Sequence, residues 1–289
     1  MVFQVTFQNP YPKLSIKALL EEKLLIPRKI RHFLRIKKHV LINGHLIHWQ
    51  NKVEQGDSIT LIFDDEDYPK KTILSGNKKL VYPIYEDEHL IVVNKPEGMK
   101  THANQPNELA LLNHVSAYVG HTCYIVHRLD KETSGLVLFA KNPFILPIIN
   151  RMLETKVIKR YYWALVEGAS FPKIITYKDK IGRHRHDRRK RVIDNKHGQK
   201  AITHLKRIKS YPKAQLLQCQ LDTGRTHQIR VHLSYHKHPI IGDPLYHSHP
   251  KGRLMLHAYQ LTLTHPLTGK NLTLYATSDS FKKCLNTQV

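Results

Sequence analysis

Short apolar runs separated by polar turns dominate the chain from about residue 80 onward. The runs are rich in branched and aromatic residues, which favour strands, and we predict strands at 90–94, 136–141, 162–167, 216–221 and 259–264. A helical pattern covers residues 144–154, where Pro147 should kink or shorten the helix. The strands do not alternate regularly with helices, so we predict an α+β fold with a mixed, largely antiparallel sheet and flanking helices.

The first 68 residues show a different pattern, in which two helical periods come before short strands. Ser15 can cap a helix over 16–24, and Pro27 suits the first turn of a second helix over 28–38. The pair Asn43-Gly44 predicts a tight turn after a strand, and a further strand follows it. This order predicts a small α/β domain at the N-terminus.

The boundary between the two patterns is marked by a change of charge. Residues 64–71 switch from acidic to basic, and turn-forming residues follow at 75–79. A chain of 289 residues is long enough for two domains. We predict an N-terminal domain over 1–68, a linker over 69–80 and a second domain over 81–289.

The charge balance points to a polyanionic partner. The chain has 46 Lys and Arg residues against 23 Asp and Glu residues, which gives a net charge of +23 and a pI near 9.9. Charge alone would suit DNA, RNA or an anionic membrane. No apolar run approaches the roughly 20 residues that span a bilayer, and no secretory signal opens the chain. We therefore expect a soluble, cytoplasmic protein without a membrane partner.

Cysteine usage gives no sign of a disulfide framework or a zinc site. The three cysteines are far apart and outside any CxxC spacing. His121, Cys123 and His127 could converge on a metal, but a strand would place all three on one face merely through its period of two. We expect no metal.

Two basic segments are candidates for contact with a nucleic acid. In the second predicted helix, basic residues surround an apolar face formed by Ile30, Phe33 and Leu34, and we select Arg28, Lys29, Arg31 and Arg35. A second cluster lies in a predicted loop over 183–191, and we select Arg183, Arg188, Arg189 and Lys190. Either segment could simply face water, but this density of charge favours RNA contact.

Residues 127–136, HRLDKETSGL, form a polar, glycine-ended loop between two apolar runs. Folds often present catalytic groups on loops that the core holds at both ends, so Asp130 is a candidate catalytic carboxylate. The alternative is that Asp130 caps a turn through the amides of Glu132 or Thr133. The local pattern alone leaves both roles open.

Residues 127–130, followed by 133–136, resemble the signature of the RluA-type pseudouridine synthases, which convert uridine in RNA to its C-glycoside isomer. Three further segments resemble family motifs in the same order: 85–98, 160–166 and 224–233, the last continuing to 242–246. The resemblance covers about 80–277, and the combination of motifs is highly specific. The N-terminal domain resembles the S4 RNA-binding domain of many of these enzymes.

The resemblance implies a role for four residues. Asp130 would act at the sugar, either by attacking it or by assisting formation of a glycal intermediate. Tyr162 would stack on the uracil or relay a proton, and Arg225 would pair with Asp130 and stabilise its charge. Arg128 would fill the space that an extruded base leaves. Without the motif, Arg225 and Arg128 would each be candidates for phosphate or surface ion-pair contacts.

The implied fold is the pseudouridine synthase fold, and the implied activity is isomerisation of specific uridines in structured RNA. The reaction needs no redox cofactor, and we expect none. Ribosomal RNA, in particular 23S RNA, is favoured over transfer RNA, and we expect a monomer. The alternatives are a non-catalytic RNA-binding or ribosome-assembly factor and an RNA glycosylase or hydrolase. The combination of Asp130, Tyr162 and Arg225 argues against both.

Overall fold

A computed structural model describes residues 3–68 and 72–286. Its largest element is a ten-stranded sheet with the order β12-β15-β16-β11-β17-β10-β8-β7, in which β18 pairs with β17 and β9 with β10. The strands are β7 (Pro83–Glu86), β8 (Leu90–Lys95), β9 (Tyr124–Ile125), β10 (Ser134–Ala140), β11 (Lys159–Glu167), β12 (Ile174–Tyr177), β15 (Thr203–Ser210), β16 (Ala214–Leu221), β17 (Leu256–Thr264) and β18 (Asn271–Tyr275).

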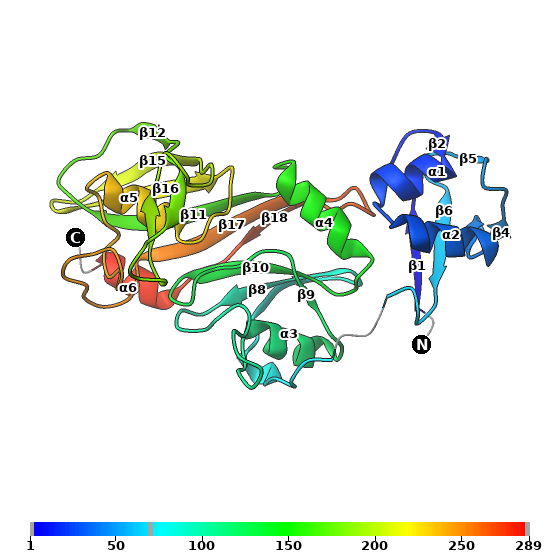
Figure 1. Cartoon of the computed structure of the whole chain (residues 1–289), viewed down its shortest axis with the longest axis horizontal. Helices are drawn as coiled ribbons and strands as arrows, with labels where there is room; N and C mark the ends of the chain where they lie inside the picture. The colour runs from blue at the N-terminus through cyan, green and yellow to red at the C-terminus, as the bar shows by residue number, and fades with distance from the viewer. Residues whose placement is uncertain (1–2, 69–71, 287–289) are drawn as a thin grey trace.

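Within this sheet β10 and β17 pair in parallel, and the other strand pairs are antiparallel. Four helices flank the sheet (Figure 1): α3 (Leu111–Val119), α4 (Ile145–Glu154), α5 (Gln228–Tyr235) and α6 (Asp279–Asn286). The prediction of an α+β fold with a mixed, largely antiparallel sheet is confirmed.

Pro147 lies inside α4 and does not end it, so the prediction that it shortens the helix is wrong. The helix runs from Ile145 to Glu154, so Pro147 is its third residue. The amides of the first turn have no partner within a helix, and a proline there removes no hydrogen bond.

A second, four-stranded sheet forms the N-terminal part, with the order β1-β6-β3-β4. Its strands are β1 (Phe3–Gln8), β3 (Val40–Ile42), β4 (His45–Leu46) and β6 (Ser58–Phe63), and a short pair of strands, β2 (Leu14–Ser15) and β5 (Lys52–Val53), lies beside it. The predicted turn at Asn43-Gly44 is confirmed, and both residues have positive φ (51° and 78°), as a two-residue hairpin loop of this type requires.

Two helical segments accompany the small sheet. The first consists of α1 (Ile16–Ala18) and a π-helical continuation, η1 (Leu19–Lys23), and the Ser15 hydroxyl caps it by accepting a hydrogen bond from the Ala18 amide at 3.1 Å. The second, α2 (Arg28–Ile36), begins directly after Pro27. It ends two residues before the predicted Lys38, which has a left-handed φ of 56°.

The segment between the two sheets is irregular where it is described. Strand β6 ends at Phe63, and β7 begins at Pro83. Of the predicted linker, 69–71 fall outside the described residues, 72–77 contain no helix or strand, and the short helix η2 covers Lys78–Leu80.

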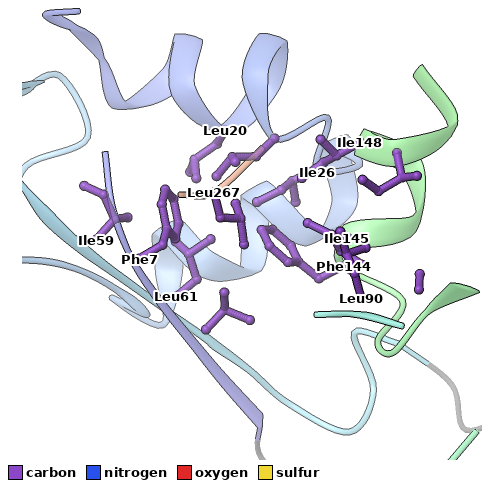
Figure 2. Close-up of a cluster of buried hydrophobic side chains, with 14 of the residues drawn as sticks. Phe7, Leu20, Ile26, Ile59, Leu61, Leu90, Phe144, Ile145, Ile148 and Leu267 are labelled. Atoms are coloured by element: carbon purple, nitrogen blue, oxygen red, sulfur yellow. The ribbon is translucent and has the colours of Figure 1, made fainter. Parts of the chain in front are cut away.

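A continuous apolar core joins the N-terminal part to the larger one (Figure 2). From the N-terminal side it includes Phe7, Leu20, Ile26, Ile59, Leu61 and Phe63, and from the other side Leu90, Phe144, Ile145, Ile148 and Leu267. The rings of Phe63 and Phe144 lie 5.5 Å apart. The N-terminal end of α4 is therefore buried against the small domain.

No helix within residues 3–68 or 72–286 combines the length and the apolar character needed to cross a bilayer.

Candidate active site

The loop that carries Asp130 is fixed by backbone contacts on both sides. The Thr101 hydroxyl donates to the Leu129 carbonyl at 2.9 Å, and it accepts from the Leu129 amide at 3.1 Å. Beyond the loop, Gly135 has a φ of 117°, and a Cβ at this position would lie 2.2 Å from the carbonyl oxygen of Ala258. The glycine of the HRLDKETSGL segment thus permits the close parallel approach of β10 to β17, which anchors the loop.

The Asp130 carboxylate points to an arginine. Its Oδ2 accepts a hydrogen bond from Nη1 of Arg230 at 3.0 Å, and Nε2 of His227 lies 3.8 Å from the same oxygen. Among the described residues, the carboxylate accepts no hydrogen bond from the amides of Glu132 or Thr133. The Asp130 carboxylate therefore does not cap the turn, which was the alternative that the local pattern left open.

Arg230 lies between two carboxylates and is only 2% exposed. Besides its bond to Asp130, it donates from Nε and Nη2 to both oxygens of Asp243, each at 2.8 Å. Burial alone would lower the pKa of Arg230, but the hydrogen bonds and charges of Asp243 and Asp130 raise it above its ordinary value. The guanidinium is a permanent positive charge that holds Asp130 in place.

Arg225, which we predicted as the partner of Asp130, does not pair with it. Its Nε donates to the backbone carbonyl of Lys200 at 3.1 Å, and its side chain is exposed at the edge of the site. The reason is that α5 begins at Gln228, so Arg225 lies in the turn before the helix while Arg230 lies within it. Residues 228–233 of α5 are all buried, which takes Arg230 into the protein.

Sequence reasoning missed Arg230, Asp243, His227 and Tyr246, although all four lie in the motif segments. A signal was present: Arg230 stands among apolar residues in a short helix, and a buried arginine requires carboxylate partners. Asp243, 13 residues later, is the second such partner.

His227 and Tyr246 connect Asp130 to the backbone of Arg191. Nδ1 of His227 lies 2.9 Å from the Tyr246 hydroxyl, which also accepts a hydrogen bond from the Arg191 amide at 2.8 Å. The Tyr246 ring lies 5.2 Å from the centre of the Arg230 guanidinium. Burial lowers the pKa of His227, and the charge of Asp130 opposes this shift only in part. The imidazole is therefore neutral near pH 7.

A pocket of about 680 Å³ opens above this group. Asp130, Tyr162, Arg225 and Arg230 line it, together with Arg128. Tyr162 comes from β11, is only 4% exposed, and has a pKa raised by burial. Its hydroxyl is protonated at neutral pH, so it is available as a hydrogen-bond donor beside the carboxylate.

Two family models match parts of the chain. The family model described as RNA pseudouridylate synthase matches residues 89–235, which contain Asp130, Tyr162, Arg225 and Arg230. The chain belongs to this family. A second model, described as the RluD ribosomal pseudouridine synthase N-terminal domain, matches residues 3–59.

Individual members of the family resemble the chain over much of its length. The chain is 42% identical over 196 residues to the uncharacterized RNA pseudouridine synthase YhcT of Bacillus subtilis, with 64% of each chain covered. It is 39% identical over 220 residues to the ribosomal large subunit pseudouridine synthase D of Neisseria meningitidis, covering 67% of this chain and 57% of that protein. The chain thus spans less than two thirds of the length of these relatives. The uncharacterized RNA pseudouridine synthase YjbO of Bacillus subtilis is 34% identical over 243 residues, covering 81% of this chain and 85% of that protein.

The fold is shared with a solved structure, the human RNA pseudouridylate synthase domain containing 4, at a TM-score of 0.60 and 24% identity. The superposition covers 71% of this chain and 92% of the human one.

In this member of the family, Arg128 lies at the edge of the pocket, two residues before Asp130. Its side chain is exposed, and Nη1 lies 3.1 Å from Nε2 of His102. Burial lowers the pKa of His102, and the charge of Arg128 lowers it further. A neutral His102 can accept the hydrogen bond, which holds Arg128 at the mouth of the pocket.

Lys95 supports the Asp130 loop from behind. It is fully buried, and its ammonium donates to the carbonyls of Pro96, Met99 and Lys131 at 2.9, 2.7 and 3.1 Å. Burial lowers the pKa of Lys95 to about 7, and the charge of Asp130 opposes the shift. The three bonds tie the segment after β8 to the loop that carries Asp130.

The basic segment predicted as a loop over 183–191 forms the connection of a hairpin over 184–190, and only its two end residues lie in strands. Strands β13 (Ile181–Arg183) and β14 (Arg191–Ile193) pair, so Arg183 lies in a strand and Arg188, Arg189 and Lys190 lie at the tip. The Arg189 side chain donates two hydrogen bonds to Asp187, at 3.1 and 3.0 Å, and its amide donates a third at 3.0 Å; these bonds lower the pKa of Asp187 to about 2. The Arg191 amide connects the hairpin to Tyr246 and so to the pocket.

The basic residues selected in the N-terminal domain lie on α2. Arg28, Arg31 and Arg35 border a common pocket, whereas Lys29 lies over the ring of Phe33 at 5.8 Å. Within residues 3–68 and 72–286, no group of three or more His, Cys, Asp or Glu side chains is arranged to hold a metal ion.

Proposed function

We propose that the chain is an RNA pseudouridine synthase that isomerises specific uridines in structured RNA, with Asp130 as the catalytic carboxylate. The observation that carries the proposal is the position of Asp130 in the 680 Å³ pocket, paired with buried Arg230 and close to Tyr162. The family membership of residues 89–235 supports it.

The reaction exchanges one bond of the nucleoside for another. The bond from N1 to C1′ breaks, the uracil turns in the pocket, and a bond from C5 to C1′ forms. The C5 proton leaves to solvent and N1 gains one, so the product is an isomer of the substrate. Asp130 serves either as the nucleophile at C1′ or as the group that assists loss of the C2′ proton to a glycal. A primary isotope effect with deuterium at C2′ would select the second route.

The surrounding residues have separate tasks in this proposal. Arg230 keeps Asp130 charged and oriented, since a buried guanidinium favours the carboxylate form of its partner. The Tyr162 ring packs against the uracil, and its hydroxyl relays a proton during the exchange. Arg225 and Arg128, both at the pocket edge, contact the RNA: Arg225 binds a phosphate, and Arg128 occupies the space of the extruded uridine.

For the RNA itself, we infer ribosomal RNA of the large subunit, 23S RNA in particular, over transfer RNA. The name of the Neisseria relative and the matched N-terminal domain model both refer to ribosomal substrates. The net charge of +23 suits a large structured RNA, and Arg183, Arg188 and Lys190 of the hairpin would follow its backbone. The enzyme would act in the cytoplasm as a monomer. Pseudouridine maps of RNA from cells with and without the protein test this assignment.

The activity is tested by tritium release from RNA labelled at uridine C5, with Asp130→Asn as the matched control. Wild-type protein should release tritium, and the variant should release none above background. A non-catalytic RNA-binding or assembly factor would release none in either form, which would overturn the proposal. Release of free uracil would identify a glycosylase.

A further inference from the structure

The catalytic pocket is lined by another arginine, Arg160, whose side chain has no partner in the protein. It lies on β11 two residues before Tyr162, and residues two apart on a strand point to the same face of the sheet. The side chain is half-buried, and its Nε is buried without a hydrogen-bond partner among the described residues. Burying a donor without a partner is destabilising, so such a donor beside a pocket indicates a ligand.

The carboxylates that line the pocket are already paired with other cations. The pairs are Asp130 with Arg230, Glu154 with Arg151 and Asp222 with Lys156, at 3.0, 3.9 and 2.8 Å. Within residues 3–68 and 72–286, no carboxylate lies within salt-bridge distance of Arg160. The charge of Arg160 is therefore available to a ligand.

The charge of Arg160 acts on the buried wall of the pocket. Burial raises the pKa of Tyr162, and the charge of Arg160 opposes this shift. Burial lowers the pKa of His127 to about 3, and the charge of Arg160 lowers it further. A Cβ at Gly224 would lie 3.8 Å from Nη1 and Nη2 of Arg160, so the lack of a side chain at Gly224 leaves the guanidinium open to the pocket.

The proposed isomerisation creates a negative charge inside this pocket. When the bond from N1 to C1′ breaks, its electron pair stays with the base, which becomes a uracil anion. A fixed cation beside the position where charge develops lowers the barrier. Arg230 is not available for this task, because its three nitrogens all donate to Asp130 or Asp243. Arg128 and Arg225 are exposed at the edge of the pocket, where they suit the RNA backbone better than the base.

We propose that Arg160 is a further catalytic residue, which binds the uracil anion while the base is detached from the sugar. Its guanidinium donates hydrogen bonds to a carbonyl oxygen of the base, over which the negative charge is spread. The electron pair moves to the base when N1 leaves C1′, and a pair of the base forms the new bond from C5 to C1′. Arg160 neither gains nor loses a proton in these steps. The role rests on the proposed synthase function.

Single-turnover tritium release separates this role from RNA binding. The substrate is total RNA, tritiated at uridine C5, from cells lacking the protein, and the enzyme is in excess. Arg160→Gln should slow release at saturating enzyme about a hundredfold, the lower range for loss of one donor to a developing anion. The Kd for the same RNA in filter binding should change by less than about twofold, because the anion does not exist in the bound substrate.

Two further variants of Arg160 test whether charge at this position is what matters. Arg160→Lys keeps the charge and should recover about tenfold of the lost rate, but not all of it, because lysine lacks the planar fork of donors. Guanidinium ion in millimolar amounts should raise the rate of Arg160→Ala saturably. Sodium at the same ionic strength should not.

The matched control removes the neighbouring charge on the same strand. Lys159 is exposed on β11 and does not line the pocket. Lys159→Gln should keep both the rate and the Kd of the wild type. Circular dichroism of each variant establishes that it is folded before its rate is compared.

Three results would overturn the role of Arg160. The first is a rate of Arg160→Gln equal to that of Lys159→Gln. The second is a raised Kd at an unchanged saturating rate, with the slope of log K against log salt reduced by about 1, which would make Arg160 a phosphate contact. The third is a loss of rate that neither lysine nor guanidinium ion restores, which would assign Arg160 to the packing of β11.

The same assay distinguishes failure of this proposal from failure of the synthase function. If the wild type releases tritium and Arg160→Gln releases it equally fast, the role of Arg160 fails and the synthase function stands. If folded wild-type protein releases none from total RNA, the synthase function fails, and the role of Arg160 fails with it.

Discussion

The protein uses arginine in two opposite ways. Arg230 is 2% exposed and bonds to two carboxylates of the protein, Asp130 and Asp243. Arg28 and Arg35 on α2 are exposed and border a pocket with a tryptophan, with no carboxylate of the described residues in salt-bridge distance. A buried, paired arginine holds the carboxylates beside it in place, whereas an exposed, unpaired one is free to bind a ligand. The burial and pairing of an arginine thus indicate its task better than its sequence motif does.

The largest effect should follow from removing the paired arginine. In Arg230→Gln, Asp130 and Asp243 lose their cation inside the protein, and breaking a buried ion pair costs about 3–5 kcal/mol. We expect the free energy of unfolding in urea to fall by this amount, with activity falling with it.

Arg225→Gln is the matched control for this variant, since it removes the arginine that the motif alone suggested. Its side chain is exposed and bonds only to a backbone carbonyl among the described residues, so stability should change by less than about 0.5 kcal/mol. Equal destabilisation by the two substitutions would contradict the assignment of Arg230 as the partner of Asp130.

Tyr162→Phe tests the hydroxyl beside the carboxylate. The ring remains, so RNA binding should be unchanged, while single-turnover isomerisation should slow about a hundredfold, the lower range for a proton-transfer group. Tyr161→Phe, on the neighbouring residue of β11, should leave the rate near that of the wild type. If Tyr162→Phe is as fast as Tyr161→Phe, the hydroxyl has no part in the reaction.

Acid should weaken the buried region through two neutral histidines. Burial lowers the pKa of His127 to about 3 and that of His257 to about 4, below the value of about 6.5 expected in the unfolded chain. As pH falls below 6.5, the two histidines take up protons in the unfolded chain but stay neutral in the folded one, so the free energy of unfolding falls. At pH 5 each histidine contributes about 2 kcal/mol to this loss.

Urea unfolding at pH 7 and pH 5 measures the loss, and His127→Gln should reduce the difference between the two pH values by about 2 kcal/mol. An unchanged difference would show that His127 is not kept neutral by the fold.

The smallest effect belongs to a single exposed arginine of α2. Arg35→Gln should weaken binding of structured RNA about threefold and reduce the slope of log K against log salt by about 1, because one phosphate contact is lost. The variant should keep its rate at saturating RNA. A reduced rate at saturation would place Arg35 in the catalytic step and remove the contrast with Arg230.

The elements that short-range chemistry determines were predictable from sequence. Ser15 caps the first helix, and Asn43-Gly44 forms the hairpin turn as expected, because both depend on neighbouring residues alone. The arginine partner of Asp130 was not predictable from sequence, because the choice between Arg225 and Arg230 depends on where α5 begins and which residues it buries. Pro147 was misjudged for a related reason: its effect depends on its place in the helix, which begins only two residues earlier.

Tertiary contacts without a local signal could not be predicted. Nothing in the pattern around Phe144 or Phe63 indicates that they share a core, since the two residues are 81 positions apart and meet only in the folded chain. The hydrogen bonds among Tyr246, His227 and Arg191 also have no local signal in the sequence. They join three separate parts of the chain: the basic hairpin, the start of α5 and the segment before β17.

The most direct test of the account measures pseudouridine itself. Folded wild-type and Asp130→Asn proteins, each in excess over RNA from cells lacking the protein, are incubated with that RNA, and the digested nucleosides are separated by chromatography. Wild-type protein should raise the amount of pseudouridine among the nucleosides, and the variant should leave it unchanged. Pseudouridine formed equally by both, or by neither, would contradict the assignment of Asp130 as the catalytic carboxylate.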